Sequence, residues 1–136
     1  MWAFSHRARV INFHMNFEDL RDLTKDPLLV EVVVAEEWDS RIFPLGVLRL
    51  KDIEGVKPHS NGDGIGNWQH MVSSRLIPCL CEEHDGIDLA LDVMEKNGLQ
   101  TIPVITRRGE LVGVVEAEEL REVRERIPQY RGDFLN

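Results

Sequence analysis

The sequence predicts an α/β fold of the α+β type, built from two copies of one strand-helix-strand-strand-helix unit. The first observation is an internal repeat, in which the stretch Val10–Val56 is followed by a similar stretch, Leu80–Val123. Equivalent residues lie 70 positions apart early in the repeat and 67 apart after its hairpin, as in Gly46 and Gly113. The second observation is that apolar runs with strand and helix periods follow one another in the same order in both stretches.

The first unit opens with a predicted strand, Val10–Phe13, which leads into a helix. Asn16 is the predicted N-cap, because its side-chain oxygen can accept a hydrogen bond from the first helical turn. The apolar residues of this helix recur at helical spacing and are Phe17, Leu20 and Leu23. The elements expected next are two hairpin strands around residues 36–41 and a short last helix, at Leu28–Ala35, Ile42–Leu50 and Asp52–Glu54.

The second unit repeats this order, beginning with a strand at Arg75–Cys81. Asp85 is the predicted N-cap of its first helix, and Gly98 is expected to end that helix in a left-handed conformation. The apolar face of this helix consists of Ile87, Ala90, Leu91 and Met94. The remaining elements are two hairpin strands and a charged helix, at Thr101–Thr106, Leu111–Val115 and Glu116–Arg126. The buried stripe expected on the last helix is Leu120, Val123 and Ile127.

The predicted boundaries are 9–56 for the first repeat, 57–69 for a linker and 70–128 for the second repeat. The linker is rich in glycine and polar residues, which is typical of a flexible connection. Its glycines, Gly62, Gly64 and Gly66, do not match a dinucleotide-binding loop. The third glycine comes one residue too early, and no strand precedes them.

Composition excludes several classes of function. The formal net charge of −8 argues against nucleic acid and anionic lipid as partners, because both would be repelled. The longest apolar stretch, LLVEVVVA, is far shorter than the roughly 20 residues of a membrane span, so no direct membrane insertion is expected. The first residues lack the features of a signal peptide. We therefore expect a cytoplasmic chain, either by itself or as the cytosolic tail of a membrane protein.

The two cysteines, Cys79 and Cys81, are expected to be small buried residues. A disulfide between residues two apart on one strand would require strained geometry. A zinc site formed with His84 would lack a fourth ligand, so no metal is expected.

The second unit resembles a CBS motif, the module named after cystathionine β-synthase. The resemblance lies in the helix IDLALDVMEKNGL, the hairpin TIPVITRRGELVGVV and an acidic residue six positions after Gly113. The first unit resembles the same motif through MNFEDLRDL and GVLRLKDI. Together they resemble a tandem CBS pair, or Bateman module. The linker and the segment IGNWQHMVSSRLIPCL look similar to the cytosolic regulatory tails of chloride channels and site-2-type membrane proteases.

The resemblance implies two repeats related by a pseudo-twofold axis, with two ligand clefts between them. Family members often bind adenosine-containing compounds there, so AMP, ATP and S-adenosylmethionine are the candidate regulatory ligands and no cofactor is required. In binding members a threonine or serine hydroxyl faces phosphate, and an aspartate three residues later takes the ribose hydroxyls. The main chain would contact the base and ribose at Ile77, Pro78, Thr101, Ile102 and Pro103.

The two units differ at these positions. In the first unit, Asp52 matches the ribose-binding aspartate and Arg49 replaces the hydroxyl residue, where it could bind phosphate with two hydrogen bonds. In the second unit, Glu119 replaces the aspartate and Glu116 departs from the pattern. A carboxylate about 4 Å from a phosphate charge is unfavourable by about 4 kcal/mol at an effective dielectric constant of about 20. We therefore expect a phosphorylated nucleotide to prefer the first cleft, and the second to be empty or to hold an uncharged nucleoside.

A structural interpretation of the same acidic residues remains open. Asp52 at a helix start can cap that helix and interact favourably with its dipole. Glu116, Glu118 and Glu119 can instead form an ordinary solvated helix face.

The function expected from these observations is that of a non-catalytic regulatory module, which senses adenine nucleotides or adenosyl compounds and modulates an attached or partner protein. An enzyme is not expected, because no nucleophile lies in a recognisable context and the five histidines are scattered. The alternative is a structural dimerisation module without a small-molecule ligand. A homodimer is expected, and a membrane transport or protease domain is the candidate attached protein.

Overall fold

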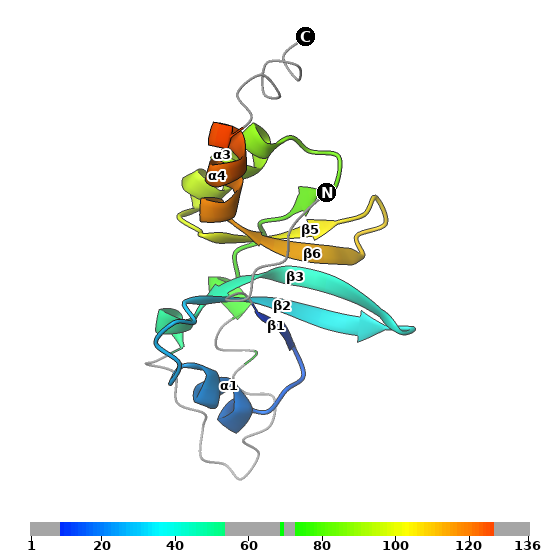
Figure 1. Cartoon of the computed structure of the whole chain (residues 1–136). Helices are drawn as coiled ribbons and strands as arrows, with labels where there is room; N and C mark the ends of the chain where they lie inside the picture. The colour runs from blue at the N-terminus through cyan, green and yellow to red at the C-terminus, as the bar shows by residue number, and fades with distance from the viewer. Residues whose placement is uncertain (1–8, 54–68, 70–72, 127–136) are drawn as a thin grey trace.

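Two three-stranded sheets lie face to face in the middle of the molecule, and each is covered on its outer side by helices (Figure 1). The structure is a computed structural model and describes residues 9–53, 69 and 73–126. The strand orders are β1-β2-β3 and β4-β5-β6, so each sheet comes from one repeat. The result is a layered arrangement in which α1 covers the first sheet, while α3 and α4 cover the second.

The elements of the first repeat follow the predicted order. They are β1 (Arg9–Asn12), α1 (Phe17–Leu23), β2 (Glu31–Trp38), β3 (Arg41–Arg49) and the 3-10 helix η1 (Leu50–Asp52). The side chain of Asn16 accepts a hydrogen bond from the Asp19 N–H, 2.8 Å away, which confirms the predicted N-cap. The predicted last helix is a single 3-10 turn as far as Asp52, and residues 54–56 lie outside the described residues.

The second repeat also follows the predicted order. Its elements are η2 (Ser73–Arg75), β4 (Cys81–Glu82), α3 (Ile87–Asn97), β5 (Thr101–Ile105), β6 (Leu111–Glu116) and α4 (Ala117–Arg126). Gly98 ends α3 with φ +65°, which confirms the predicted left-handed cap. The predicted linker falls almost entirely outside the described residues, as does Ile127.

The two sheets share one register, and this confirms the duplication at the level of backbone pairing. Ile11 of β1 pairs with Val34 in parallel, and Cys81 of β4 pairs with Val104, each 70 positions later. Both hairpins also contain an irregularity at the same place, between Val34 and Ala35 and between Val104 and Ile105. A β-bulge of this kind bends a strand, and its recurrence gives both sheets the same local shape.

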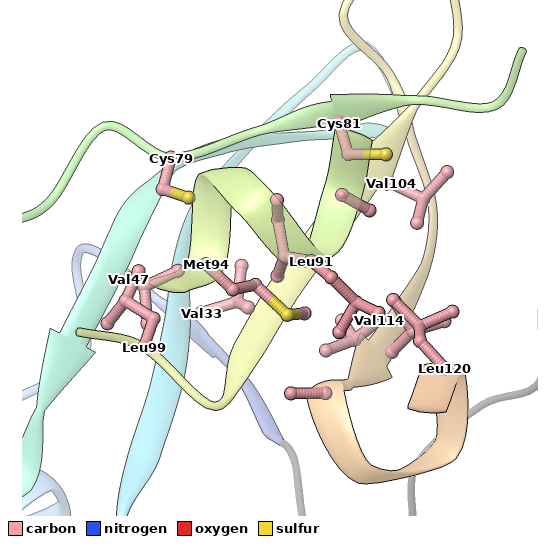
Figure 2. Packing of buried hydrophobic residues seen from close by; sticks show 14 residues of the cluster. Val33, Val47, Cys79, Cys81, Leu91, Met94, Leu99, Val104, Val114 and Leu120 are labelled. Carbon is pink, nitrogen blue, oxygen red and sulfur yellow. The ribbon is translucent and has the colours of Figure 1, made fainter. Parts of the chain in front are cut away.

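The core joins the two repeats because side chains of a strand alternate between its faces. Val33 and Val47 of the first repeat belong to the same buried cluster as Met94 and Val114 of the second (Figure 2). Their neighbours Val32, Val34 and Leu48 point the other way, into a second cluster beside α1. The run Glu31–Ala35 is therefore buried on both faces, which explains its continuous apolar sequence.

Both cysteines are buried and free, as predicted, with 2% of each exposed. Burial raises the pKa of the Cys79 thiol to about 11 and that of Cys81 to about 12. Nearby acidic groups act in the same direction, Glu31 on Cys79 and Asp85 on Cys81.

Two predictions for the second repeat were wrong. Asp85 is not the N-cap of α3, because its carboxylate accepts a hydrogen bond from the Glu82 N–H and Gly86 occupies the cap position. The predicted strand Arg75–Cys81 is not continuous. Ile77 pairs with β3 of the first sheet, whereas Cys81 pairs with β5 of the second, so this segment crosses between the sheets.

Two further predictions need correction. The first hairpin turns at Asp39 and Ser40, both with positive φ, rather than over six residues, since two left-handed residues suffice for a tight turn. Val123 of α4 is 40% exposed rather than buried, because α4 turns Leu120 and Ala117 toward the core instead.

Candidate ligand site between the repeats

A cavity of about 160 Å³ lies where the two repeats meet, next to the first residues of β2 and β5. Its lining residues come from both repeats and are Leu28, Val30, Glu31, Gln100, Thr101, Glu116 and Glu118. Two of these, Thr101 and Glu116, are residues that the sequence assigns to ligand binding. They are cross-strand neighbours in the hairpin of β5 and β6.

The equivalent neighbours in the first repeat are Glu31 and Arg49, which pair across β2 and β3. Glu31 corresponds to Thr101 at the offset of 70, and Arg49 corresponds to Glu116 at the offset of 67. The same backbone framework thus carries an acid and a base on one side of the pseudo-twofold axis, and a hydroxyl and an acid on the other.

Arg49 reaches across to the second repeat. Its Nη2 donates hydrogen bonds to the carbonyl oxygens of Asn97 at 2.6 Å and Gly98 at 3.1 Å. These carbonyls end α3, where the helix dipole favours a positive charge. Arg49 is not among the residues that line the cavity.

Glu31 also reaches across to the second repeat. It is 5% exposed, and its two carboxylate oxygens accept the Gln100 N–H at 3.1 and 3.0 Å. Burial raises the pKa of the Glu31 carboxyl above its ordinary value, while hydrogen bonds from Gln100 and Thr101 and the charge of Arg49 oppose this rise.

The two residues expected to bind ribose hydroxyls have other contacts. The Oε1 of Glu119 accepts the Glu116 N–H at 3.1 Å, which is half of a capping box at the start of α4. The main-chain carbonyl of Asp52 accepts a hydrogen bond from the Arg75 guanidinium. Asp52 itself is partly buried in η1.

The remaining expected contact residues lie on two segments. Ile77 exchanges two main-chain hydrogen bonds of 2.9 Å with Val47, so its backbone forms part of the first sheet, and Pro78 follows it on the surface. Thr101, Ile102 and Pro103 are buried at the start of β5. Only Thr101 among these five residues lines the described cavity.

Sequence reasoning missed Glu31, Gln100, Leu28 and Val30. Glu31 carried a usable signal, because a single acidic residue in the apolar run LLVEVVVA must find a partner when the strand is buried. The other three residues lie before β2 and β5, where no residue type indicates a site.

Comparisons with known proteins identify the fold. No model of a known protein family matches the chain, and no curated protein matches it in sequence. A CBS domain pair/ACT domain protein of Thermotoga maritima is similar in structure, with 16% identity and a TM-score of 0.65 over 88% of this chain and 90% of that chain. The CBS domains of a transcriptional regulator from Streptococcus pneumoniae are similar over 90% of this chain and 93% of that chain, with 17% identity and a TM-score of 0.60.

The CBS domain of a bacterial CNNM/CorC-family Mg²⁺ transporter, solved in complex with ATP, is also similar. It has 19% identity and a TM-score of 0.59, over 86% of this chain and 78% of that chain. The fold of this chain is therefore that of a CBS domain pair. No helix in the described part of the chain is long and apolar enough to cross a membrane.

Proposed function

We propose that this chain is a non-catalytic regulatory module that binds an adenosine-containing compound between its repeats and modulates an attached or partner protein. The observation that carries the proposal is the cavity lined by Val30 of the first repeat and by Thr101 and Glu116 of the second. A ligand that contacts both repeats can favour one arrangement of them over another, as regulation requires. The ATP in the similar transporter domain supports a ligand of this class.

The charge of the cavity favours a ligand without net negative charge. Glu31, Glu116 and Glu118 line it, and none of the lining residues that the structure describes is basic. A phosphate would be repelled by these carboxylates, whereas the sulfonium and amino groups of S-adenosylmethionine would be attracted. For this cavity we therefore propose adenosine or S-adenosylmethionine in preference to AMP or ATP.

A nucleotide phosphate at Arg49 and Asp52 is the competing proposal. It requires the guanidinium to share or leave the Asn97 and Gly98 carbonyls, which it contacts in this structure. Binding there would therefore be accompanied by a change at the end of α3.

Calorimetric titration with adenosine, S-adenosylmethionine, AMP and ATP tests both proposals. We expect adenosine and S-adenosylmethionine to bind more tightly than ATP. In Glu116→Gln, which removes one charge from the cavity, we expect the affinity for ATP to rise by about tenfold, a change of about 1.4 kcal/mol, with little change for adenosine. Glu125→Gln is the matched control, since Glu125 is an exposed acid of α4 that does not line the cavity.

Two other results of the titration would contradict the cavity proposal. Tighter binding of ATP that is lost in Asp52→Ala would overturn the cavity proposal and favour the cleft of Arg49 and Asp52. No heat and no thermal shift with any of the four compounds would leave the dimerisation module as the function.

A specific observation favours that second function. Leu89 of α3 and Val123 of α4 are exposed on two helices that pack against each other, with 50% and 40% of each residue accessible. We propose that a second copy of the chain covers them. Light scattering on the wild type and on Leu89→Glu tests this, and a monomeric wild type would contradict it.

We further propose that the regulated protein is a membrane transport protein. The similarity to a domain of a Mg²⁺ transporter supports this choice over a protease or a chloride channel. Sequencing the coding regions on either side of this chain would test the proposal, and a neighbouring protease domain would overturn it.

A further inference from the structure

We propose that Glu31 and Arg49 act together as a latch, which holds residues 97–100 of the second repeat and fixes how the repeats are joined on one side of the pseudo-twofold axis.

The two side chains of the latch bind opposite ends of the segment 97–100. Arg49 binds the carbonyls of Asn97 and Gly98, and Glu31 binds the N–H of Gln100. Gly98 is fitted to this contact, because a Cβ at this position would lie 2.8 Å from Nη2 of Arg49. The Arg49 guanidinium thus binds the carbonyl groups at the end of α3, and the Glu31 carboxylate binds the N–H group that follows them; both are charge-assisted hydrogen bonds.

The held segment connects directly to both helices of the second repeat. Asn97 is the last residue of α3, and the carbonyl of Gln100 accepts the N–H of Ala117, the first residue of α4, at 2.8 Å. Movement of the latch would therefore be transmitted to α3 and α4 together.

A cavity adjoins the latch, and the equivalent residues of the second repeat line it instead of forming a second latch. Glu116 and Thr101, which correspond to Arg49 and Glu31, line it. A glutamate cannot donate hydrogen bonds to carbonyls as Arg49 does. Glu31 and Gln100 belong to the latch and also line the cavity. Opening of the latch would therefore change the shape of the cavity, and a ligand in the cavity would affect the latch.

The two buried thiols provide a built-in readout of latch opening. Sγ of Cys79 lies 3.9 Å from Nδ2 of Asn97, beside the latch, whereas Cys81 lies farther along the same segment near Val104 (Figure 2). Both thiols are equally buried, so global unfolding exposes both, and release of the latch exposes Cys79 first.

The experiment measures the rate at which an aromatic disulfide reagent labels each thiol. Cys79 is read in a Cys81→Ala background, and Cys81 in a Cys79→Ala background. In Arg49→Met, which keeps the apolar stem but loses the donors, we expect Cys79 to react about 10- to 100-fold faster, as expected when hydrogen bonds from a charged donor are lost. We expect the rate at Cys81 to change much less.

Three variants make the result specific. Arg49→Lys keeps a charged donor and should restore part of the protection. Lys51→Met removes an exposed charge two residues away and should leave both rates unchanged. Glu31→Asp keeps the negative charge that acts on the Cys79 thiol but shortens the reach to the Gln100 N–H. It should accelerate Cys79 less than Arg49→Met, and it is the test variant if Arg49→Met does not fold. Equal acceleration of both thiols, or no acceleration of Cys79, would overturn the latch.

Discussion

At Gly46 the backbone of β3 passes so close to Ile77 that a side chain does not fit. A Cβ there would lie 2.8 Å from the Ile77 carbonyl oxygen, which accepts a hydrogen bond from Val47. We expect Gly46→Ala to lower the free energy of unfolding by about 1–3 kcal/mol, because the pairing must open to admit the methyl group.

Urea unfolding measures this effect, and Gly86→Ala is its matched control. A Cβ at Gly86 meets nothing within 4 Å, and its backbone conformation suits any residue. We expect the control to lose less than Gly46→Ala, about 0.5 kcal/mol, because alanine is a weaker N-cap than glycine but meets no close neighbour. A similar loss in both variants would show that the close approach to Ile77 is not the cause of the effect.

The two thiols give the stability a dependence on alkaline pH. Their pKa values in the folded protein, about 11 and about 12, lie above the ordinary 9.0 that an unfolded chain would show. The unfolded state therefore loses these protons first, and stability present below pH 9 is lost as the pH rises through 11 and 12. The loss approaches about 1.4 kcal/mol per pH unit for each thiol.

Urea unfolding at pH 8, 9 and 10 under reducing conditions measures this slope. In the double variant Cys79→Ala/Cys81→Ala, we expect a shallower slope, whatever its absolute stability. An unchanged slope would mean that the thiols ionise equally in both states.

At the scale of single residues, the sequence correctly predicted features that depend only on neighbouring groups, such as helix caps. Asn16 and Gly98 occupy their predicted cap positions, because caps depend on a few neighbouring backbone groups. The partners of Arg49 and Glu31 could not be predicted, since these contacts span 48 or more positions and exist only once the repeats are packed. Whether the expected contact residues bind a ligand stays a prediction.

At the scale of elements, the cap of α1 gives a direct test of how that helix is held. We expect Asn16→Ala to destabilise the protein by about 1 kcal/mol, because the Asp19 N–H loses its acceptor. Asn16→Ser should retain most of the stability, since serine can accept the same bond. Thermal unfolding by circular dichroism measures both, and equal loss in the two variants would contradict the capping argument.

The type of each element could be predicted because the helix and strand periods of the sequence are clear. The residues at which elements begin and end were harder to predict. The segment 75–81 reads as one strand in sequence, yet its pairing is divided between two sheets. Periodicity within a segment carries no information about which neighbour a strand will find. The matching bulges in the two hairpins are likewise visible only in the register.

At the scale of the whole molecule, one shared cluster makes the repeats interdependent. Val33 belongs to the first repeat but packs in the core of the second. We expect Val33→Ala to cost about 2 kcal/mol and to reduce hydrogen-exchange protection in β5 as well as in β2. Loss of protection confined to β2 would show that the repeats unfold separately.

Val30→Ala is the control for this prediction, because Val30 lies close by in the chain but is largely exposed. We expect its effect to stay within about 0.5 kcal/mol. The duplication made the overall arrangement predictable, since two units that each leave one sheet face apolar must cover each other. The side-chain asymmetry across the axis was visible in the sequence, but its consequence, a latch beside a cavity, was not.

The three-residue difference between the repeats resides in the length of their hairpins. The hairpin of β2 and β3 extends beyond that of β5 and β6 (Figure 1), and β2 ends at Trp38, which is 75% exposed. This overhang lies beyond both buried clusters, so it is a natural attachment point for a fluorophore, an affinity tag or an inserted peptide. A probe placed there would follow the first repeat without disturbing the packing between the two.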